Sequence, residues 1–378
     1  MKRRSAGGYP PYPASDHYDP VRRRFFNPEP QRLLRPLDFA GAFKMFRRQG
    51  RFPARPLPFM RPDFSAFSQA GGRLPENERS EFRQNECSEF RQNERGGFLQ
   101  KGQGVLGAHQ ADEQAARFVW FGHSTLLLRV AGLNILTDPV FGMSAAPHNG
   151  MFRRFQPPPA APQELPPLDV ILYSHSHYDH LEEAFVRRVA RSGVRFIVPL
   201  GMEVLLRRWG VPAGNILTAD WYQRHHVGAV GFTAVPARHD SSRNLADRNR
   251  ALWAGWAIEG GGQRFYFSGD SSYGSHFAEI GRRFDGFDLA FVENGQYDRR
   301  WPDNHMFPEQ TVQAAIDVGA RRLMPIHWGA FSLALHDWDE PVRRSMPLAQ
   351  SRGLPVLTPL MGQVFGVDTE TRFWWEEI

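Results

Sequence analysis

Three histidines and an aspartate fall within six residues, directly after an apolar stretch. His175, His177, Asp179 and His180 follow the segment DVILY, which is typical of a buried strand. His175 and His177 are two residues apart, so in an extended chain both side chains leave on the same side and can reach one metal ion. Asp179 and His180 follow as the chain turns into a predicted helix, so their side chains leave in a different direction and can serve a second metal ion nearby. Imidazole and carboxylate ligands together suit zinc, iron or manganese.

Further candidate ligands stand where other predicted strands end. His239 follows FTAVPAR, Asp270 follows RFYFSG, and His327 follows LMPI. In an α/β arrangement, ligands and catalytic groups gather outside strand ends. A single histidine after a strand is more often structural, but together these three residues supply the ligands that the first motif lacks.

Strands alternate with helices along the second part of the chain, which predicts sheets covered by helices. The folded body is expected to begin near Arg117. The pattern predicts strands at Phe118–Trp120, Ser124–Val130, Leu133–Leu136, Val170–Tyr173, Phe196–Val198, Phe232–Val235, Arg264–Phe267, Leu289–Val292 and Leu323–Ile326. It predicts helices at Leu181–Ser192, Gly201–Gly210, Pro308–Val318 and Glu340–Arg352.

The basic character of the chain is concentrated at its N-terminal end. The 378 residues carry a net charge of +6, and residues 1–60 hold 13 Lys and Arg against 4 Asp and Glu. That segment is therefore +9 and the remainder about −3. A basic segment can attract phosphates, anionic lipid or nucleic acid, and a solvated tail is an equal alternative. Because the body is not basic, nucleic acid is not the expected partner.

Three regions follow from composition: an aromatic-rich arm over 1–70, a low-complexity insertion over 71–116, and a domain over 117–378. In the arm, Asp38–Arg48 has the spacing of a short helix. The insertion repeats ERSEFRQN as ECSEFRQN, which predicts a disordered segment without a catalytic role.

The single cysteine, Cys87, excludes an internal disulfide. No apolar run resembles a signal peptide or a membrane span, so a cytoplasmic location is expected, with peripheral contact at the inner face of a membrane left open.

The motif HSHYDH resembles the HxHxDH signature of the metallo-β-lactamase superfamily, and the later ligand motifs match it in order. Within that superfamily, the wording resembles the branch of N-acylphosphatidylethanolamine-hydrolysing phospholipase D and its bacterial relatives. The resemblance covers the chain from about Phe118 onward, and ENGQY at Glu293–Tyr297 is closer to the bacterial relatives. The segments that carry it are Asp16–Pro30, Trp120–Arg129, Leu136–Phe141, Phe267–Tyr273 and Met324–Phe331.

The resemblance implies an α+β fold, a four-layer αββα sandwich, with two zinc ions per chain (manganese or iron being alternatives). His175, His177 and His239 would hold one zinc ion, and Asp179, His180 and His327 the other. Asp270 would bridge both ions together with a hydroxide that attacks a phosphodiester of a phospholipid. Asp138 would support the site from behind the ligands, and Asp179 and His305 would take a direct part in catalysis.

Other readings of the residues remain open. His123, Tyr297 and Trp301 are candidates for substrate binding, although packing roles compete with this in each case. A lactonase or other ester hydrolase of the same fold would use nearly the same ligands. A scaffold that binds metal without catalysis is the alternative of another class. The resemblance also suggests a homodimer.

Overall fold

The computed structural model describes residues 9–29, 50–68, 115–146, 152–244 and 246–378. The predicted helix Asp38–Arg48, the eight-residue repeat and Cys87 lie outside these ranges, so those predictions stay untested. The domain boundaries also stay predictions, although the first strand of the body does begin at Arg117.

A seven-stranded sheet forms one half of the molecule, with strand order β15-β3-β4-β5-β6-β7-β8. Strands from β15 to β5 pair antiparallel, and those from β5 to β8 pair parallel. The strands are β3 (Arg117–Trp120), β4 (Leu126–Val130), β5 (Leu133–Thr137), β6 (Val170–Leu172), β7 (Arg195–Pro199), β8 (Ile216–Ala219) and β15 (Val364–Phe365).

A six-stranded sheet forms the other half, with strand order β14-β13-β12-β11-β10-β9. Here β12, β13 and β14 are parallel, whereas β9 to β12 pair antiparallel. The strands are β9 (Arg224–Val227), β10 (Val230–Val235), β11 (Gly255–Gly260), β12 (Gln263–Phe267), β13 (Leu289–Glu293) and β14 (Leu323–Ile326).

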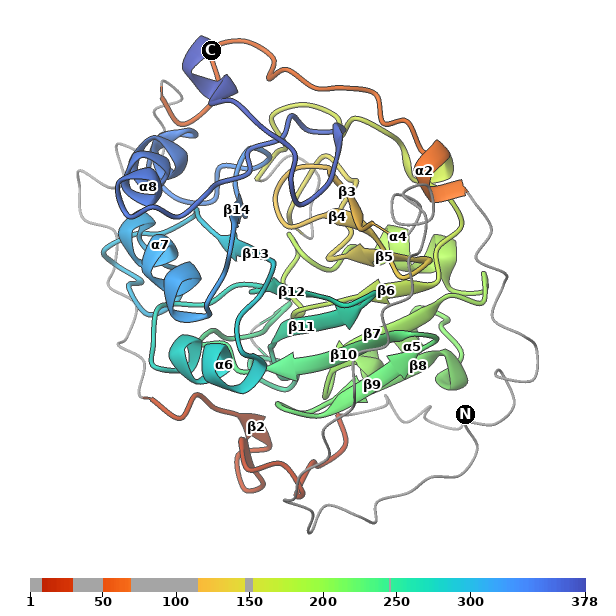
Figure 1. Ribbon diagram of the computed structural model, residues 1–378. Coiled ribbons are helices and arrows are strands. Elements are labelled where there is room, and N and C mark those ends of the chain that lie inside the picture. Colours follow the sequence, from red (N-terminus) through yellow and green to blue (C-terminus); the bar gives the residue numbers. More distant parts are fainter. Residues whose placement is uncertain (1–8, 30–49, 69–114, 147–151, 245) are drawn as a thin grey trace, which may run out of the picture.

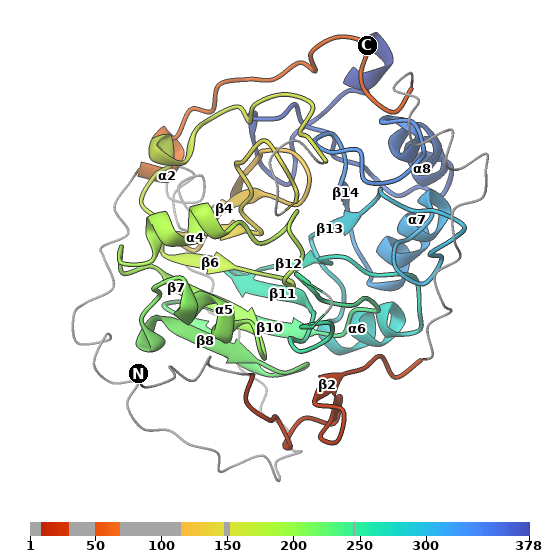
Figure 2. The same ribbon diagram turned by 180° about the vertical axis from the view of Figure 1, so that it is seen from behind.

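Helices cover the outer face of each sheet (Figures 1 and 2). Two helices, α4 (Glu183–Val189) and α5 (Glu203–Arg208), pack on the seven-stranded sheet. On the six-stranded side lie α6 (His276–Phe284), α7 (Pro308–Asp317) and α8 (Glu340–Ser351). A short helix, α2 (Ser65–Ser68), precedes the body. This arrangement confirms the predicted αββα sandwich of the metallo-β-lactamase type.

Alternation along β3 explains how one strand serves two apolar layers. Phe118 and Trp120 face the core between the two sheets, whereas Val119 faces the core beneath the helices α4 and α5. Because side chains on a strand alternate in direction, a continuous apolar run is what a strand buried on both faces requires. The ring of Phe118 reaches the opposite sheet, with its centroid 5.2 Å from that of Phe265 and 5.4 Å from that of Phe291.

Each strand and helix predicted in the body is present, with ends shifted by a few residues. The sequence pattern missed β8, β9, β11, β15 and α6. β9 has the sequence RHHV and lies at the edge of the sheet, where it pairs with β10 alone. Its polar residues lack the apolar pattern by which a strand is recognised in the sequence. α6 contains Gly281, where a Cβ atom would lie 2.2 Å from the carbonyl oxygen of Asp317 in α7. The glycine that obscures this helix in the sequence is therefore required by its packing against α7.

Across the described ranges, no helix is both long and apolar enough to cross a membrane. The cytoplasmic location stays a prediction.

Substitution Phe118→Ala should lower the free energy of unfolding by about 3–5 kcal/mol, because a fully buried ring that joins the two sheets leaves a cavity. Val21→Ala is the control, since that side chain is 91% exposed and should change stability by no more than about 0.5 kcal/mol. Denaturant unfolding followed by circular dichroism measures both. Equal midpoints for the two variants would contradict this account of the core.

Candidate metal centre

The chemistry-bearing residues meet where strands of both sheets end. In the seven-stranded sheet, Asp138 follows β5 and His175 follows β6. In the six-stranded sheet, Asp270 follows β12, Glu293 ends β13 and His327 follows β14. Neighbouring strands within each of these two sets are parallel, so their carboxyl ends share one edge. The fold thereby brings His175 and Asp270, which are 95 positions apart, to 3.8 Å from each other.

Gly269 permits the close approach of the two sheets at this point. Its φ is +57°, and a Cβ atom there would lie 2.6 Å from Cβ of Ser174. Any other residue would force the segment that carries Asp270 away from the histidine motif. The Gly in FSGD is therefore part of the geometry of the site.

Asp138 is a fully buried carboxylate that organises the histidine motif. It accepts hydrogen bonds from the Ser174 amide (2.7 Å), from the Ser174 hydroxyl, and from Nδ1 of His180 (2.7 Å). Because the Ser174 hydroxyl proton is engaged with Asp138, Nδ1 of His175, 2.9 Å away, donates to the Ser174 oxygen. Nε2 of His175 is then unprotonated and directed into the site, and the bond from Nδ1 of His180 to Asp138 turns Nε2 of His180 toward Asp179 and Asp270.

His175, His177 and His239 form the first group of converging nitrogens. Nδ1 of His239 donates to the carbonyl oxygen of Asn304 (3.0 Å), so its Nε2 is also unprotonated. Nδ1 of His177 lies 2.9 Å from Nε2 of His175 and 3.2 Å from Nε2 of His239. Nitrogens bound tetrahedrally to one zinc ion at 2.0–2.1 Å would be about 3.3 Å apart. The three nitrogens therefore have the spacing of ligands that share one ion.

A second group forms around Asp179 and His180. Oδ2 of Asp179 lies 3.3 Å from Nε2 of His180 and 2.8 Å from Nε2 of His123. One ligand atom from each of His123, Asp179, His180 and His327 fits within 4.8 Å of the others. The structure thus brings together the three residues expected to hold the second ion and adds His123, which the sequence reasoning treated as a candidate for substrate binding.

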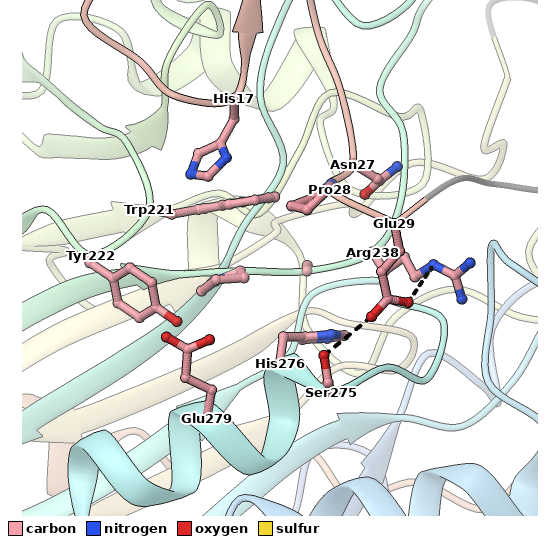
Figure 3. A pocket seen from close by; sticks show the side chains of 12 residues that line it. His17, Asn27, Pro28, Glu29, Trp221, Tyr222, Arg238, Ser275, His276 and Glu279 are labelled. Atoms are coloured by element: carbon pink, nitrogen blue, oxygen red, sulfur yellow. Dashed lines mark hydrogen bonds and ion pairs between the residues drawn. The ribbon is translucent and has the colours of Figure 1, made fainter.

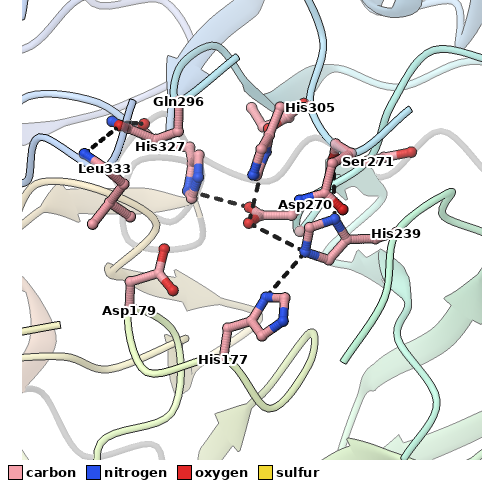
Figure 4. Close-up of polar contacts among 12 residues, drawn as sticks. His177, Asp179, His239, Asp270, Ser271, Gln296, His305, His327 and Leu333 are labelled. Carbon is pink, nitrogen blue, oxygen red and sulfur yellow. Dashed lines mark hydrogen bonds and ion pairs between the residues drawn. The ribbon is translucent and has the colours of Figure 1, made fainter. Parts of the chain in front are cut away.

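Asp270 lies between the two groups (Figure 4). Its Oδ2 is 3.8 Å from Nε2 of His175, 3.7 Å from Nε2 of His239 and 3.1 Å from Nε2 of His180. Its Oδ1 is 3.2 Å from Nδ1 of His327. This is the position that a carboxylate bridging two ions needs.

The cluster has the properties of a cation site. Burial, reinforced by neighbouring imidazoles, holds the pKa of His175, His239 and His327 well below the usual value, so these rings are neutral at pH 7. Within the described part of the chain, Nε2 of His180, Nε2 of His327 and Oδ1 of Asp270 are buried without a hydrogen-bond partner. Buried lone pairs of this kind are costly unless a cation satisfies them. The buried His/Asp cluster is therefore a metal-binding site.

His305 stands beside this cluster, and its partner was not predicted from the sequence. Nδ1 of His305 is 2.8 Å from Oε2 of Glu293 and 4.0 Å from Oδ2 of Asp270. The other carboxyl oxygen of Glu293 accepts the amide of Met306 (2.6 Å). Burial raises the pKa of Glu293 well above its usual value. The signal available in the sequence was a charged residue that ends the otherwise apolar strand LAFVE.

The three candidates for substrate binding are held by protein contacts. His123 is fully buried, and its ring centroid lies 4.0 Å from that of His327. The Tyr297 hydroxyl donates to Glu340 (2.8 Å), and Nε1 of Trp301 donates to the Gln296 carbonyl (2.9 Å). Their part in substrate binding stays a prediction.

An open cleft of about 440 Å³ leads to His177 and Asp179. Its apolar lining includes Phe152, which is 47% exposed, and Leu333. On the polar side, Arg248 has a side chain that is 54% exposed, at 3.5 Å from Asp240. The cleft therefore offers a charged group and an apolar surface beside the metal centre.

A second cavity, of about 200 Å³, lies between the arm and the body (Figure 3). His17, Pro28 and Glu29 of the arm face Trp221 and Tyr222 across it. The two aromatic residues of the body line this cavity together with His17, whose ring centroid is 4.1 Å from that of Trp221. Trp221 and Tyr222 therefore form part of the surface of the body on which the arm packs.

Comparison with known proteins agrees with the fold and the metal centre. The model of the Beta-lactamase superfamily domain matches residues 133–328. The uncharacterized protein Rv0906 of Mycobacterium tuberculosis is 41% identical over 274 residues, which covers 71% of this chain and 73% of the relative. The chain therefore belongs to the metallo-β-lactamase superfamily. Its fold and buried His/Asp cluster define a metal-dependent hydrolase of that superfamily.

More distant relatives carry names that describe a reaction. N-acyl-phosphatidylethanolamine-hydrolyzing phospholipase D 1 of Caenorhabditis elegans is 33% identical over 237 residues, covering 58% of this chain and 65% of the relative. Among solved structures, the metallo hydrolase Igni18 from Ignicoccus hospitalis has a TM-score of 0.52 at 20% identity, covering 68% of this chain and 100% of that one. The solved structure shows a shared fold.

Substitution Asp138→Asn should weaken metal binding about 10- to 100-fold, because the carboxylate that orients His180 and, through Ser174, His175 is lost. Asp169→Asn is a matched control: this carboxylate accepts the Asn134 amide (2.8 Å) beside the opposite end of β6. Competition with a zinc chelator measures the affinity of each variant. Equal affinities would remove Asp138 from the support of the site.

Proposed function

We propose that the chain is a dinuclear zinc hydrolase that cleaves a phosphodiester bond of a phospholipid, in the manner of a phospholipase D acting on N-acylphosphatidylethanolamine. The observation that carries the proposal is the cleft beside His177 and Asp179, with Arg248 on one side and Phe152 and Leu333 among its apolar lining. A phospholipid presents an anionic phosphate and apolar chains together, which is the chemistry that such a cleft complements.

The relatives support the same substrate class. Proteins of Caenorhabditis elegans and Saccharomyces cerevisiae named as N-acyl-phosphatidylethanolamine-hydrolyzing phospholipases D are 33% and 32% identical to this chain over 237 and 244 residues. Both alignments cover about 60% of the chain, so they bear on the body and its site more than on the arm.

The residues divide the chemical work between them. His175, His177 and His239 would hold one zinc ion, Asp179, His180 and His327 the other, and Asp270 both. Zinc supplies charge that polarises a phosphate oxygen and lowers the pKa of a bound water toward 7. Asp138 and Ser174 hold the imidazoles of the motif in the tautomer that leaves Nε2 free for a metal.

His305 and Glu293 form the acid of the proposed reaction. The two groups lie 2.8 Å apart and can hold one proton between them, because burial disfavours a charged Glu293. His305 donates a proton from Nε2 to the departing alkoxide, and Nδ1 receives the carboxyl proton of Glu293 in return. The pair thereby delivers a proton without leaving an imidazolate on His305, and it ends as a neutral imidazole beside the carboxylate of Glu293.

Hydrolysis of N-acylphosphatidylethanolamine by the zinc-loaded protein in oxygen-18 water tests the reaction. Attack at phosphorus should place the heavy oxygen in phosphatidic acid, leaving the N-acylethanolamine unlabelled. A simple lactone is run alongside. Lactone opening without lipid cleavage would move the enzyme to the lactonase class, and metal binding without either reaction would favour a non-catalytic scaffold.

Substitution Glu293→Gln should lower kcat by at least 10-fold with little change in KM or metal content, because the amide cannot return a proton to His305. His305→Ala should lower kcat by about 100-fold or more, and the double variant should be no slower than His305→Ala. Glu183→Gln is the control, since that half-exposed carboxylate pairs with Arg187 on α4. Steady-state kinetics and metal analysis separate the outcomes; additive losses in the double variant would argue against a coupled pair.

A further inference from the structure

The arm contains a rigid hairpin whose tip is basic and apolar. β1 (Tyr18–Asp19) and β2 (Arg24–Phe25) pair antiparallel, and residues 20–23 form the turn between them. One carboxylate oxygen of Asp19 accepts the amides of Val21 and Arg22, each at 2.9 Å. The turn is therefore held by its own hydrogen bonds.

The two sides of the hairpin have opposite character. Tyr18 and Phe25 are buried, with ring centroids 5.1 Å apart, and both rings pack against that of Tyr12 at 5.4–5.7 Å. At the tip, Val21 is 91% exposed and the Arg22 side chain is 82% exposed. Arg24 and Phe26 are exposed next to them, which gives a surface of arginine and apolar side chains.

Backbone strain marks the same turn. Arg23 has a φ of +55°, a left-handed conformation that glycine adopts without cost and arginine does not. Its guanidinium donates to the Tyr9 carbonyl (2.6 Å), which ties the turn to the preceding segment of the arm. The strained residue thus helps to hold the tip in one shape.

The hairpin is bonded to the segment that forms the wall of the catalytic cleft. The Phe25 amide donates to the Asn249 carbonyl (2.8 Å), and Asn249 follows Arg248, which lines the cleft. Two residues after Phe25, Asn27 donates to the carbonyl of the metal ligand His239 (2.7 Å). A surface that binds the hairpin would therefore also keep the cleft close to that surface.

We propose that this hairpin, residues 19–26, docks on an anionic membrane surface, with Val21 and Phe26 entering the interface and Arg22 and Arg24 contacting lipid phosphates. Arginine beside exposed apolar side chains complements a membrane surface, which offers anionic headgroups to the arginines and acyl chains to the apolar side chains. A nucleic-acid backbone would use the arginines but leave an aliphatic tip such as Val21 without a partner. The docking does not depend on the proposed reaction.

The test is sedimentation of the full-length zinc-loaded protein with vesicles of equal parts phosphatidylcholine and phosphatidylglycerol, and with vesicles of phosphatidylcholine alone. The wild type should bind the anionic vesicles and not the neutral ones. The double variant R22Q/R24Q should bind roughly 30-fold more weakly, and V21S several-fold more weakly. R188Q/R191Q, which removes the same charge from exposed arginines in and just after α4, should bind like the wild type.

Figures 1 and 2 both show α4 well away from β2, so the two double variants alter separate surfaces. Arg23 is left in place because it bonds Tyr9, and thermal melts check that each variant folds. Failure of the wild type to bind anionic vesicles would overturn the proposal. Equal losses in R22Q/R24Q and R188Q/R191Q would also overturn it, because the attraction would then be general. So would a V21S variant that binds as the wild type, since the tip would then bind anions alone.

Discussion

Three aspartates, Asp138, Asp179 and Asp270, are buried at the edge where the two sheets meet. Three hydrogen-bond donors offset the charge of Asp138, whereas Asp179 and Asp270 crowd their negative charges around Nε2 of His180, which despite burial raises the pKa of His180 well above its usual value. A divalent cation resolves this conflict, because carboxylate oxygens and bare imidazole nitrogens are both its ligands. The surrounding strand ends and turns place these carboxylates and imidazoles where a cation can contact both.

The backbone around the centre is strained where it carries these groups. His123, Asp138 and His327 all have positive φ values, of 54°, 36° and 66°. Such conformations cost of order 1–3 kcal/mol each and persist when the surroundings over-determine them. Here the surroundings are two sheets joined by an apolar core, so the stability of the sandwich supports the geometry of the site.

The arm links the metal centre to the outer surface of the molecule. Asn27 contacts the carbonyl of His239, while the hairpin tip a few residues earlier is exposed to solvent. The cavity lined by His17 and Trp221 lies between the arm and the body. One short segment of chain therefore joins the proposed docking hairpin to a residue of the metal centre.

The sequence by itself determined the metal chemistry and the layered fold. The spacing of His175, His177, Asp179 and His180 after an apolar strand is local information, and strand periodicity is also local. Only the tertiary structure decided that Glu293 pairs with His305 and that Asp179 also contacts His123, because residues 12 and 56 positions apart meet through strand order and turns. It also decided that Trp221 packs against the arm and does not line the cleft. The sequence around an aromatic residue that follows a strand does not indicate which cavity its side chain will line.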